Sequence, residues 1–300
     1  MKNRKPKSLT STSRLFYLFI SPWLIGFGVF TFFPMIFSLV ISFTEWNGLN
    51  APTFIGIQNY LNAFKTDKMF LTSLANTFYY VGISVPATTV FAIILSLLLN
   101  KRLPGTNFFR SIFYLPTICT GVAFYITWLY LYNKDSGFIN VLLSFIGIQG
   151  PGWLTNVDLA MPSLILMDLF VCGTAMTIVL AGLQDIPTSY YEAADIDGAG
   201  AFLKFRKITF PMISPVVFFN FLMALIKGLQ IFTQPYVMTD GGPANSTYVY
   251  GLHLYKSAFQ YSKFGYSSAM AWILFVILIV LSVVVFASSK GWVYYREDVN

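Results

Sequence analysis

The chain has 300 residues, of which 56% are hydrophobic and only 10% are Asp, Glu, Lys or Arg, and its formal net charge is +7. Soluble domains usually contain about 25% charged residues, so this composition excludes a soluble enzyme, a disordered chain and a disulfide scaffold. It indicates a polytopic membrane protein.

Long uncharged runs predict six membrane-spanning segments. A helix of about 20 residues crosses a hydrocarbon layer of about 30 Å, and each run is near or above that length. Backbone polar groups cannot go unpaired in lipid, so we expect helices and an all-α fold class. In chain order, the predicted spans cover residues 15–43, 77–99, 111–132, 159–183, 212–238 and 269–287.

The distribution of Lys and Arg predicts the orientation of these spans. Most basic residues lie in the N-terminal segment, the second and fourth loops and the C-terminal segment. The opposite side carries fewer, namely Lys65, Lys68, Lys134, Lys256 and Lys263. The positive-inside rule then places both termini in the cytoplasm. We therefore divide the chain into a cytoplasmic segment (1–14), a six-helix membrane domain (15–288) and a cytoplasmic tail (289–300).

The fourth loop, residues 185–211, has more local structure than a linker needs. Ser189 and Glu192 have the spacing of a capping box, which predicts a short helix that starts near Tyr190. Gly198 and Gly200 are expected to end this helix.

A second short helix is predicted in the same loop. Phe202, Phe205 and Ile208 recur at three-residue spacing, and Pro211 marks the start of the fifth span. A helix–Gly–helix element with small residues such as Ala193 and Ala194 would let another protein come close. The alternative is an interfacial helix that only rests on lipid headgroups.

Several stretches together resemble one known family. Glu192-Ala193-Ala194, Asp197-Gly198-Ala199, Ile208 and Pro211 are similar to the EAA loop of bacterial ABC importer permeases, and more narrowly of those for carbohydrates. Residues 239–247, Thr-Asp-Gly-Gly-Pro-Ala-Asn-Ser-Thr, are similar to the T-x-G-G-P-x-x-x-T signature of one permease of a sugar importer. Residues 54–60 and 109–116 also match this family.

The resemblance implies a type I ABC importer permease of the bacterial plasma membrane. Such a chain forms half of a translocation path, and a second permease of similar fold forms the other half. Two cytosolic ATPase subunits, which hold the ATP and Mg²⁺, bind the EAA loops, and an external binding protein delivers the sugar. A nucleic-acid partner is not expected.

The resemblance also implies which residues couple to the ATPase. Glu192 would face a basic group on that subunit, and Gly198 would permit the turn between the two loop helices. The capping box is an alternative role for Glu192, and both roles can hold together. The implied coupling residues are Glu192, Ala193, Ala194, Asp197, Gly198, Ile208 and Pro211.

The chain is not expected to be an enzyme. It lacks the G-x-x-x-x-G-K-[ST] phosphate-binding loop, so ATP hydrolysis should occur on separate subunits. With His253 as its only histidine, the sequence offers no His-based metal cluster, and we expect neither a catalytic residue nor a metal or cofactor on this chain.

Two ionisable residues lie within the predicted spans, Asp168 in the fourth and Lys227 in the fifth. A charge there costs roughly 2.5–3.5 kcal/mol on insertion scales. The two side chains could pair with each other, or Lys227 could face a water-filled path. Asn220, Gln230 and Gln234 are spaced to lie on one helix face with Lys227, and amide, charged and aromatic groups suit a sugar.

The resemblance adds further candidates on the fifth span. Ala224, Lys227, Gly228 and Ile231 fall where relatives place sugar contacts, although Gly228 fits a helix-packing role equally well. The full set of candidate path residues is Asp168, Asn220, Ala224, Lys227, Gly228, Gln230, Ile231 and Gln234.

A lysine on that face suggests that the transported glycan carries a carboxylate, such as a uronate. The alternative function is an ATP-independent secondary transporter or channel that uses Asp168 as an ion site. Such proteins often have inverted repeats, and the sequence shows none.

Overall fold

The computed structural model describes residues 9–101, 104–119 and 121–294. It divides into two compact units. The first contains Met1–Ala63 and Ser257–Ile273, and the second contains Phe64–Lys256 and Leu274–Asn300. The last helix, α15 (Phe264–Ser289), contributes to both units.

The first unit begins with the N-terminal span. Helix α1 (Leu9–Phe27) continues through a π-helical turn (Gly28–Phe32) into α2 (Phe33–Ser42). The turn lies just before Pro34, and the Phe33 amide bonds five residues back to Gly28 O. Proline and π-helical turns are each a common cause of a departure from regular helix geometry. From Phe16 to Ser42 this segment is apolar enough to cross a membrane.

The rest of the first unit packs around a short hairpin. Strand β1 (Thr44–Glu45) pairs antiparallel with β2 (Thr53–Phe54), and α3 (Gln58–Lys65) follows. The buried Asn59 amide donates to Ser42 O and Thr44 O, each at 2.9 Å, so it closes the end of α2 against α3. A π-helical turn (Lys256–Gln260) leads to the start of α15.

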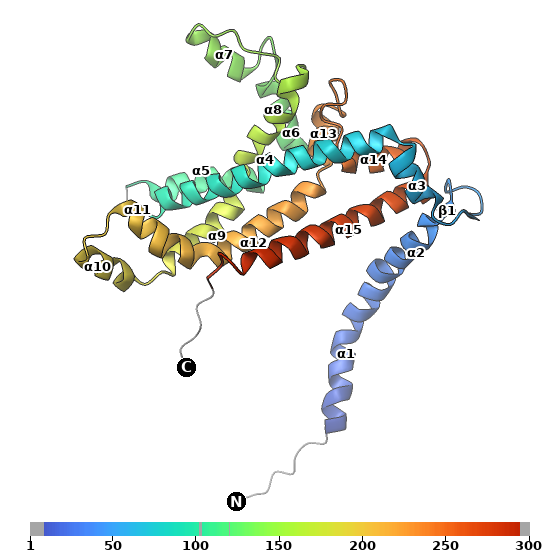
Figure 1. Cartoon of the computed structure of the whole chain (residues 1–300), viewed down its shortest axis with the longest axis horizontal. Helices are drawn as coiled ribbons and strands as arrows, with labels where there is room; N and C mark the ends of the chain where they lie inside the picture. The colour runs from blue at the N-terminus through green and yellow to red at the C-terminus, as the bar shows by residue number, and fades with distance from the viewer. Residues whose placement is uncertain (1–8, 102–103, 120, 295–300) are drawn as a thin grey trace, which may run out of the picture. The chain divides into compact units, whose positions relative to one another are not determined.

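Helix α4 (Lys68–Leu99) lies at the centre of the second unit. Asp67 caps it, because its Oδ1 accepts from the amides of Met69 and Phe70 at 2.9 and 3.2 Å. Figure 1 shows α4 alongside several helices. Its neighbours are α5 (Thr106–Ile118), α8 (Val157–Leu169), α9 (Gly173–Gln184), α12 (Phe210–Leu229) and α14 (Tyr250–Tyr255).

Apolar side chains of these helices form the core of the second unit. The largest cluster includes Leu164, Leu229 and Leu252, all fully buried, and Leu274 and Leu278 of α15 pack against it. Smaller clusters join α4 to α9 and α9 to α12. The remaining helices are α6 (Val122–Leu131), α7 (Phe138–Phe145), α10 (Thr188–Ile196), α11 (Ala201–Lys204) and α13 (Thr233–Met238).

The all-α polytopic fold predicted from the sequence is confirmed. In the described ranges four helical segments can cross a membrane unaided, and α5–α6 and α8–α9 make six if each broken pair is one span. Several bounds differ from the prediction. The first predicted span agrees with the apolar segment Phe16–Ser42, but α4 begins at Lys68 instead of 77, and the fifth span covers Ala201–Leu229 instead of 212–238.

The break in the fourth span brings α9 against α5. Helices α8 and α9 meet at 44°, and α9 begins at Gly173. A Cβ on Gly173 would lie 2.5 Å from Thr117 Oγ1 and 2.6 Å from the backbone oxygen of Phe113. Only glycine therefore fits where the two helices cross, as is common for small residues at helix contacts in membranes.

We expect Gly173→Ala to destabilise the protein, because its methyl group would push against the α5 backbone. The loss should be about 1–3 kcal/mol, the usual range for overpacking. Thermal unfolding in lipid nanodiscs measures it. Gly82→Ala is the control, because a Cβ on Gly82 of α4 meets nothing within 4 Å. Equal unfolding temperatures for the two variants would contradict this account of Gly173.

Candidate functional site

Helix α10 forms the first limb of the predicted helix–Gly–helix loop. It begins at Thr188, after Pro187, and no side chain caps its first turn. The predicted capping box is therefore wrong: Ser189 lies inside the first turn, where its side chain cannot act as the N-cap. Pro187 occupies the N-cap position instead, with φ −59° and ψ 134° and no side-chain hydrogen bond to the first turn.

Gly198 ends α10 with a left-handed residue. Its φ is +72°, and the amide of Ala199 bonds back to Ala194 O at 2.9 Å while that of Gly198 bonds to Asp195 O at 3.1 Å. A Cβ at this position would meet nothing within 4 Å. Glycine is thus favoured here by its backbone conformation and not by crowding.

The predicted second short helix is not separate from the fifth span. Helix α11 continues through a π-helical turn (Phe205–Thr209) into α12, so one helical segment runs from Ala201 to Leu229. Pro211 lies in the first turn of α12 and does not mark a boundary. The wider turn before it, in which the Phe210 amide bonds to Phe205 O, lets the helix pass the proline.

One face of α10 is tied to this fifth span. The Tyr191 hydroxyl lies 2.9 Å from Thr209 Oγ1, and the Tyr191 ring packs with Ile208 on the apolar cluster that includes Ile213. Lys204 of α11 forms an ion pair with Asp195 near the end of α10. A displacement of α10 would therefore be passed directly to the fifth span.

The opposite face of the loop is open. Glu192, Ala193, Asp197 and Gly198 are exposed, and Ala194 is half-buried. Ile196 is 87% exposed. Ile208 and Pro211 of the predicted coupling set are half-buried on the fifth span instead.

The carboxylate of Asp168 is bonded from α4. Tyr80 Oη donates to it, and Ser84 Oγ donates to the same oxygen at 3.0 Å. No ion pair joins Asp168 to Lys227 within the part of the chain that the structure describes. Asp168 is thus stabilised by hydrogen bonds from two hydroxyl groups of α4 and not by an ion pair with Lys227.

Sequence reasoning missed these two partners. Tyr80 and Ser84 are four residues apart on α4, so they share one helix face, and this spacing was the signal that could have found them. Gln234 adds a third contact near this site: its Nε2 donates to Leu164 O at 2.9 Å. The result is a polar cluster of Asp168, Tyr80, Ser84 and Gln234 between α4, α8 and α13.

The polar stripe predicted along the fifth span is wrong. Helix α12 ends at Leu229, Gln230 follows as its C-cap, and Gln234 lies on the separate helix α13. Lys227 and Gln230 are exposed, whereas Asn220 and Gln234 are buried. Counting in steps of a helix turn across Ile231 and Phe232 failed because the chain leaves helical geometry there.

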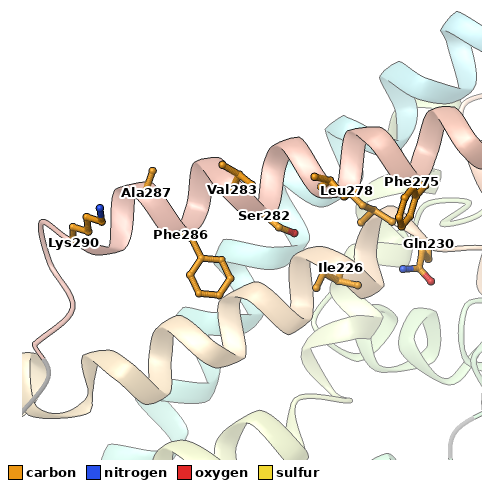
Figure 2. Close-up of a pocket in the computed structure, with 10 residues that line it drawn as sticks. Ile226, Gln230, Phe275, Leu278, Ser282, Val283, Phe286, Ala287 and Lys290 are labelled. Carbon is orange, nitrogen blue, oxygen red and sulfur yellow. The ribbon is translucent and has the colours of Figure 1, made fainter. Parts of the chain in front are cut away.

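Gln230 differs in its surroundings from the other candidates. Gln230 lines a groove of about 750 Å³ between α12 and α15, together with apolar side chains such as Phe275 and Leu278 (Figure 2). By contrast, Ala224 and Ile231 pack in the core. A Cβ on Gly228 would be 3.1 Å from Val81 of α4. Gly228 therefore lies where α12 packs closely on α4, which agrees with the helix-packing alternative for this glycine.

The loop after α13 is tightly bonded. Thr239 Oγ1 lies 2.7 Å from Thr247 Oγ1, which also donates to Gly242 O at 2.7 Å. Asn76 of α4 donates to Asn245 O and to Tyr248 O. The first and last threonines of the predicted signature therefore close this loop and α4 holds it.

Comparison with known proteins identifies relatives of the whole chain. Residues 68–291 match the family model described as "Binding-protein-dependent transport system inner membrane component". A probable ABC transporter permease, YesP of Bacillus subtilis, is 41% identical over 98% of this chain and 96% of its own. The multiple sugar-binding transport system permease MsmF of Streptococcus mutans is 33% identical over 87% and 90%.

A solved structure shows the same fold. It is a chain of a bacterial alginate ABC transporter, in complex with a periplasmic protein that holds an alginate pentasaccharide. The TM-score is 0.83, with 94% of this chain and 96% of that chain covered, and the sequence identity is 21%.

We expect Tyr80 and Asp168 to be energetically coupled. Tyr80→Phe removes the donor of the hydrogen bond between them, and Asp168→Asn replaces its carboxylate acceptor. The double variant should therefore lose less stability than the sum of the two single losses. Couplings across membrane helices average about 0.6 kcal/mol and reach about 1.7. Unfolding in nanodiscs gives the four values of the cycle. Strict additivity would show that the two side chains do not act together.

Proposed function

This chain belongs to the family of binding-protein-dependent transport system inner membrane components and is a permease of a carbohydrate-uptake ABC importer, and we propose that it couples to its ATPase through α10. Members of this family are transport subunits and not enzymes, and in such importers ATP is hydrolysed on separate ATPase subunits. What remains is how this chain takes part in transport.

We propose a complex of four membrane-associated subunits and an external binding protein. This chain and a second, similar permease would enclose the path, and two ATPases, carrying ATP and Mg²⁺, would bind from the cytoplasm. The excess of Lys and Arg in the N-terminal segment, the second and fourth loops and the C-terminal segment favours a cytoplasmic location for both termini.

The arrangement of α10 is the observation that carries the coupling proposal. Its exposed face presents Glu192, Ala193 and Ile196, and its other face is fixed to the fifth span through Tyr191 and Thr209. A partner that moves the exposed face would move the span with it. Closure of the ATPases would in this way shift the permease between inward-open and outward-open states.

We expect Glu192→Ala and Ala193→Trp to weaken attachment of the ATPase without preventing membrane insertion. The first removes a charge from an exposed helix position, and the second fills the space that a close partner needs. A lost charge-assisted bond of about 1.5–3 kcal/mol predicts a fall in transport of about tenfold or more. Co-purification in mild detergent and uptake by proteoliposomes measure the two effects.

Asp158→Asn is the matched control, since Asp158 is an exposed carboxylate at the start of α8. It should leave both measurements unchanged. Normal recovery of the ATPase with both α10 variants would contradict the coupling proposal. Uptake by this chain alone, with no ATPase present, would favour the ATP-independent alternative instead.

We also propose that the substrate is an acidic oligosaccharide. Lys227 is exposed on α12 and has no ion-pair partner among the described residues. An ammonium group held within a membrane span needs either water or an anion, and a uronate carboxylate passing along the path would supply the anion.

We expect Lys227→Gln to reduce uptake of trigalacturonate by about tenfold, because a charge-assisted bond becomes a neutral one. Uptake of maltotriose, a neutral trisaccharide, should change less. The complete importer in proteoliposomes, with its binding protein, gives both rates. If the wild-type importer takes up maltotriose and not trigalacturonate, the acidic-substrate proposal is wrong.

A further inference from the structure

A second cavity lies outside the spans, between three segments of the second unit. It has a volume of about 660 Å³. Its walls come from the chain after α6, the chain before α8 and the outer loop after α13. In the proposed orientation all three segments lie on the outer side of the membrane. The volume falls in the range of small-molecule sites, about 300–1,000 Å³.

An aromatic wall forms one side of this cavity. The rings of Trp153 and Tyr132 lie 5.7 Å apart. Trp153 Nε1 donates to Asn140 Oδ1 at 2.7 Å, and Tyr132 Oη donates to Ser163 O at 2.8 Å. Since the polar atoms of both rings are already bonded to the protein, the half-buried Trp153 is left to present ring surface to the cavity.

Two oppositely charged side chains complete the lining. Lys134 and Asp135 are both exposed, and neither forms an ion pair within the described ranges. Their backbone is nevertheless fixed. Asn133 Oδ1 accepts from the amide of Asp135 at 3.0 Å, and Asn140 Nδ2 donates to Lys134 O at 2.9 Å. A rigid turn thus holds an unused ammonium and an unused carboxylate beside an aromatic ring.

We infer that this cavity is an outer subsite that binds one or two sugar residues of the glycan before the glycan enters the path between the spans. A sugar ring has apolar C–H faces that pack on an aromatic ring. Its hydroxyl groups both donate and accept, so a carboxylate and an ammonium can each bind them. The inference rests on the sugar-permease function and adds a site that is separate from Lys227.

The charge content favours a sugar over other occupants. A purely apolar partner would leave Lys134 and Asp135 without bonds, whereas a hydroxylated ring satisfies both. The ammonium also suits a uronate carboxylate, but the site does not depend on one, since a carboxylate and an ammonium also bind neutral hydroxyls. The subsite can therefore hold even if the glycan is neutral.

The test uses the complete importer in nanodiscs with its binding protein, and compares wild type with Lys134→Gln/Asp135→Asn. Both side chains are exposed, so the fold should not change. Trigalacturonate and maltotriose are the probes. We expect the concentration for half-maximal ATPase stimulation to rise about tenfold for whichever probe the wild type uses, with the maximal rate unchanged. Direct binding of both probes by saturation-transfer NMR, without ATP or the binding protein, gives an independent readout.

The control is Glu45→Gln/Lys65→Gln, which makes the same charge change at two exposed residues that do not line the cavity. Its half-maximal concentration for ATPase stimulation and its NMR binding should equal those of wild type. An unchanged half-maximal concentration in the cavity variant, with NMR binding also unchanged, would overturn the subsite while leaving the proposed function intact. Weaker attachment of the sugar-free binding protein would overturn it too, because the cavity would then be a protein-docking surface. If neither probe stimulates the wild type, NMR binding that the cavity variant loses supports the subsite, and absent binding overturns it.

Discussion

A carboxylate inside a membrane-spanning helix must find polar partners, and α4 provides them for Asp168. Tyr80 and Ser84 donate to it from α4, and Gln234 of α13 bonds to the backbone one turn away. Two of the helix breaks, between α8 and α9 and between α12 and α13, lie within a few residues of this cluster along the chain. Irregular backbone at membrane depth is tolerated where other protein groups can bond to it.

Helix α4 therefore has two roles that depend on each other. It packs against α8, α9 and α12 as the centre of the core, and its polar face fixes the broken segments beside it. It also holds the loop after α13 through Asn76. A change in the position of α4 would displace both the polar cluster and the loop after α13.

In the loop between α9 and α12, one face of α10 is bonded to the rest of the chain. Tyr191 and the ion pair of Asp195 with Lys204 fix that face, and the face with Glu192 and Ile196 is left exposed. Since α11 continues through the π-helical turn (Phe205–Thr209) into α12, the second limb of the loop is part of the fifth span. The joint nearest to α10 is the left-handed turn at Gly198.

The sequence by itself determined the membrane fold, the family and the turn at Gly198, because long apolar runs and a left-handed glycine depend on neighbouring residues alone. It did not determine which polar residues meet. Gln230 and Gln234 were assigned to one helix face, yet α12 ends between Lys227 and Gln230, and the partners of Asp168 come from a helix far away in the chain. Helix ends and polar contacts of this kind are fixed by packing between segments, such as the close approach of Gly251 to Ile231 O. Only the tertiary structure could decide them, since periodicity carries no information about the neighbouring helix.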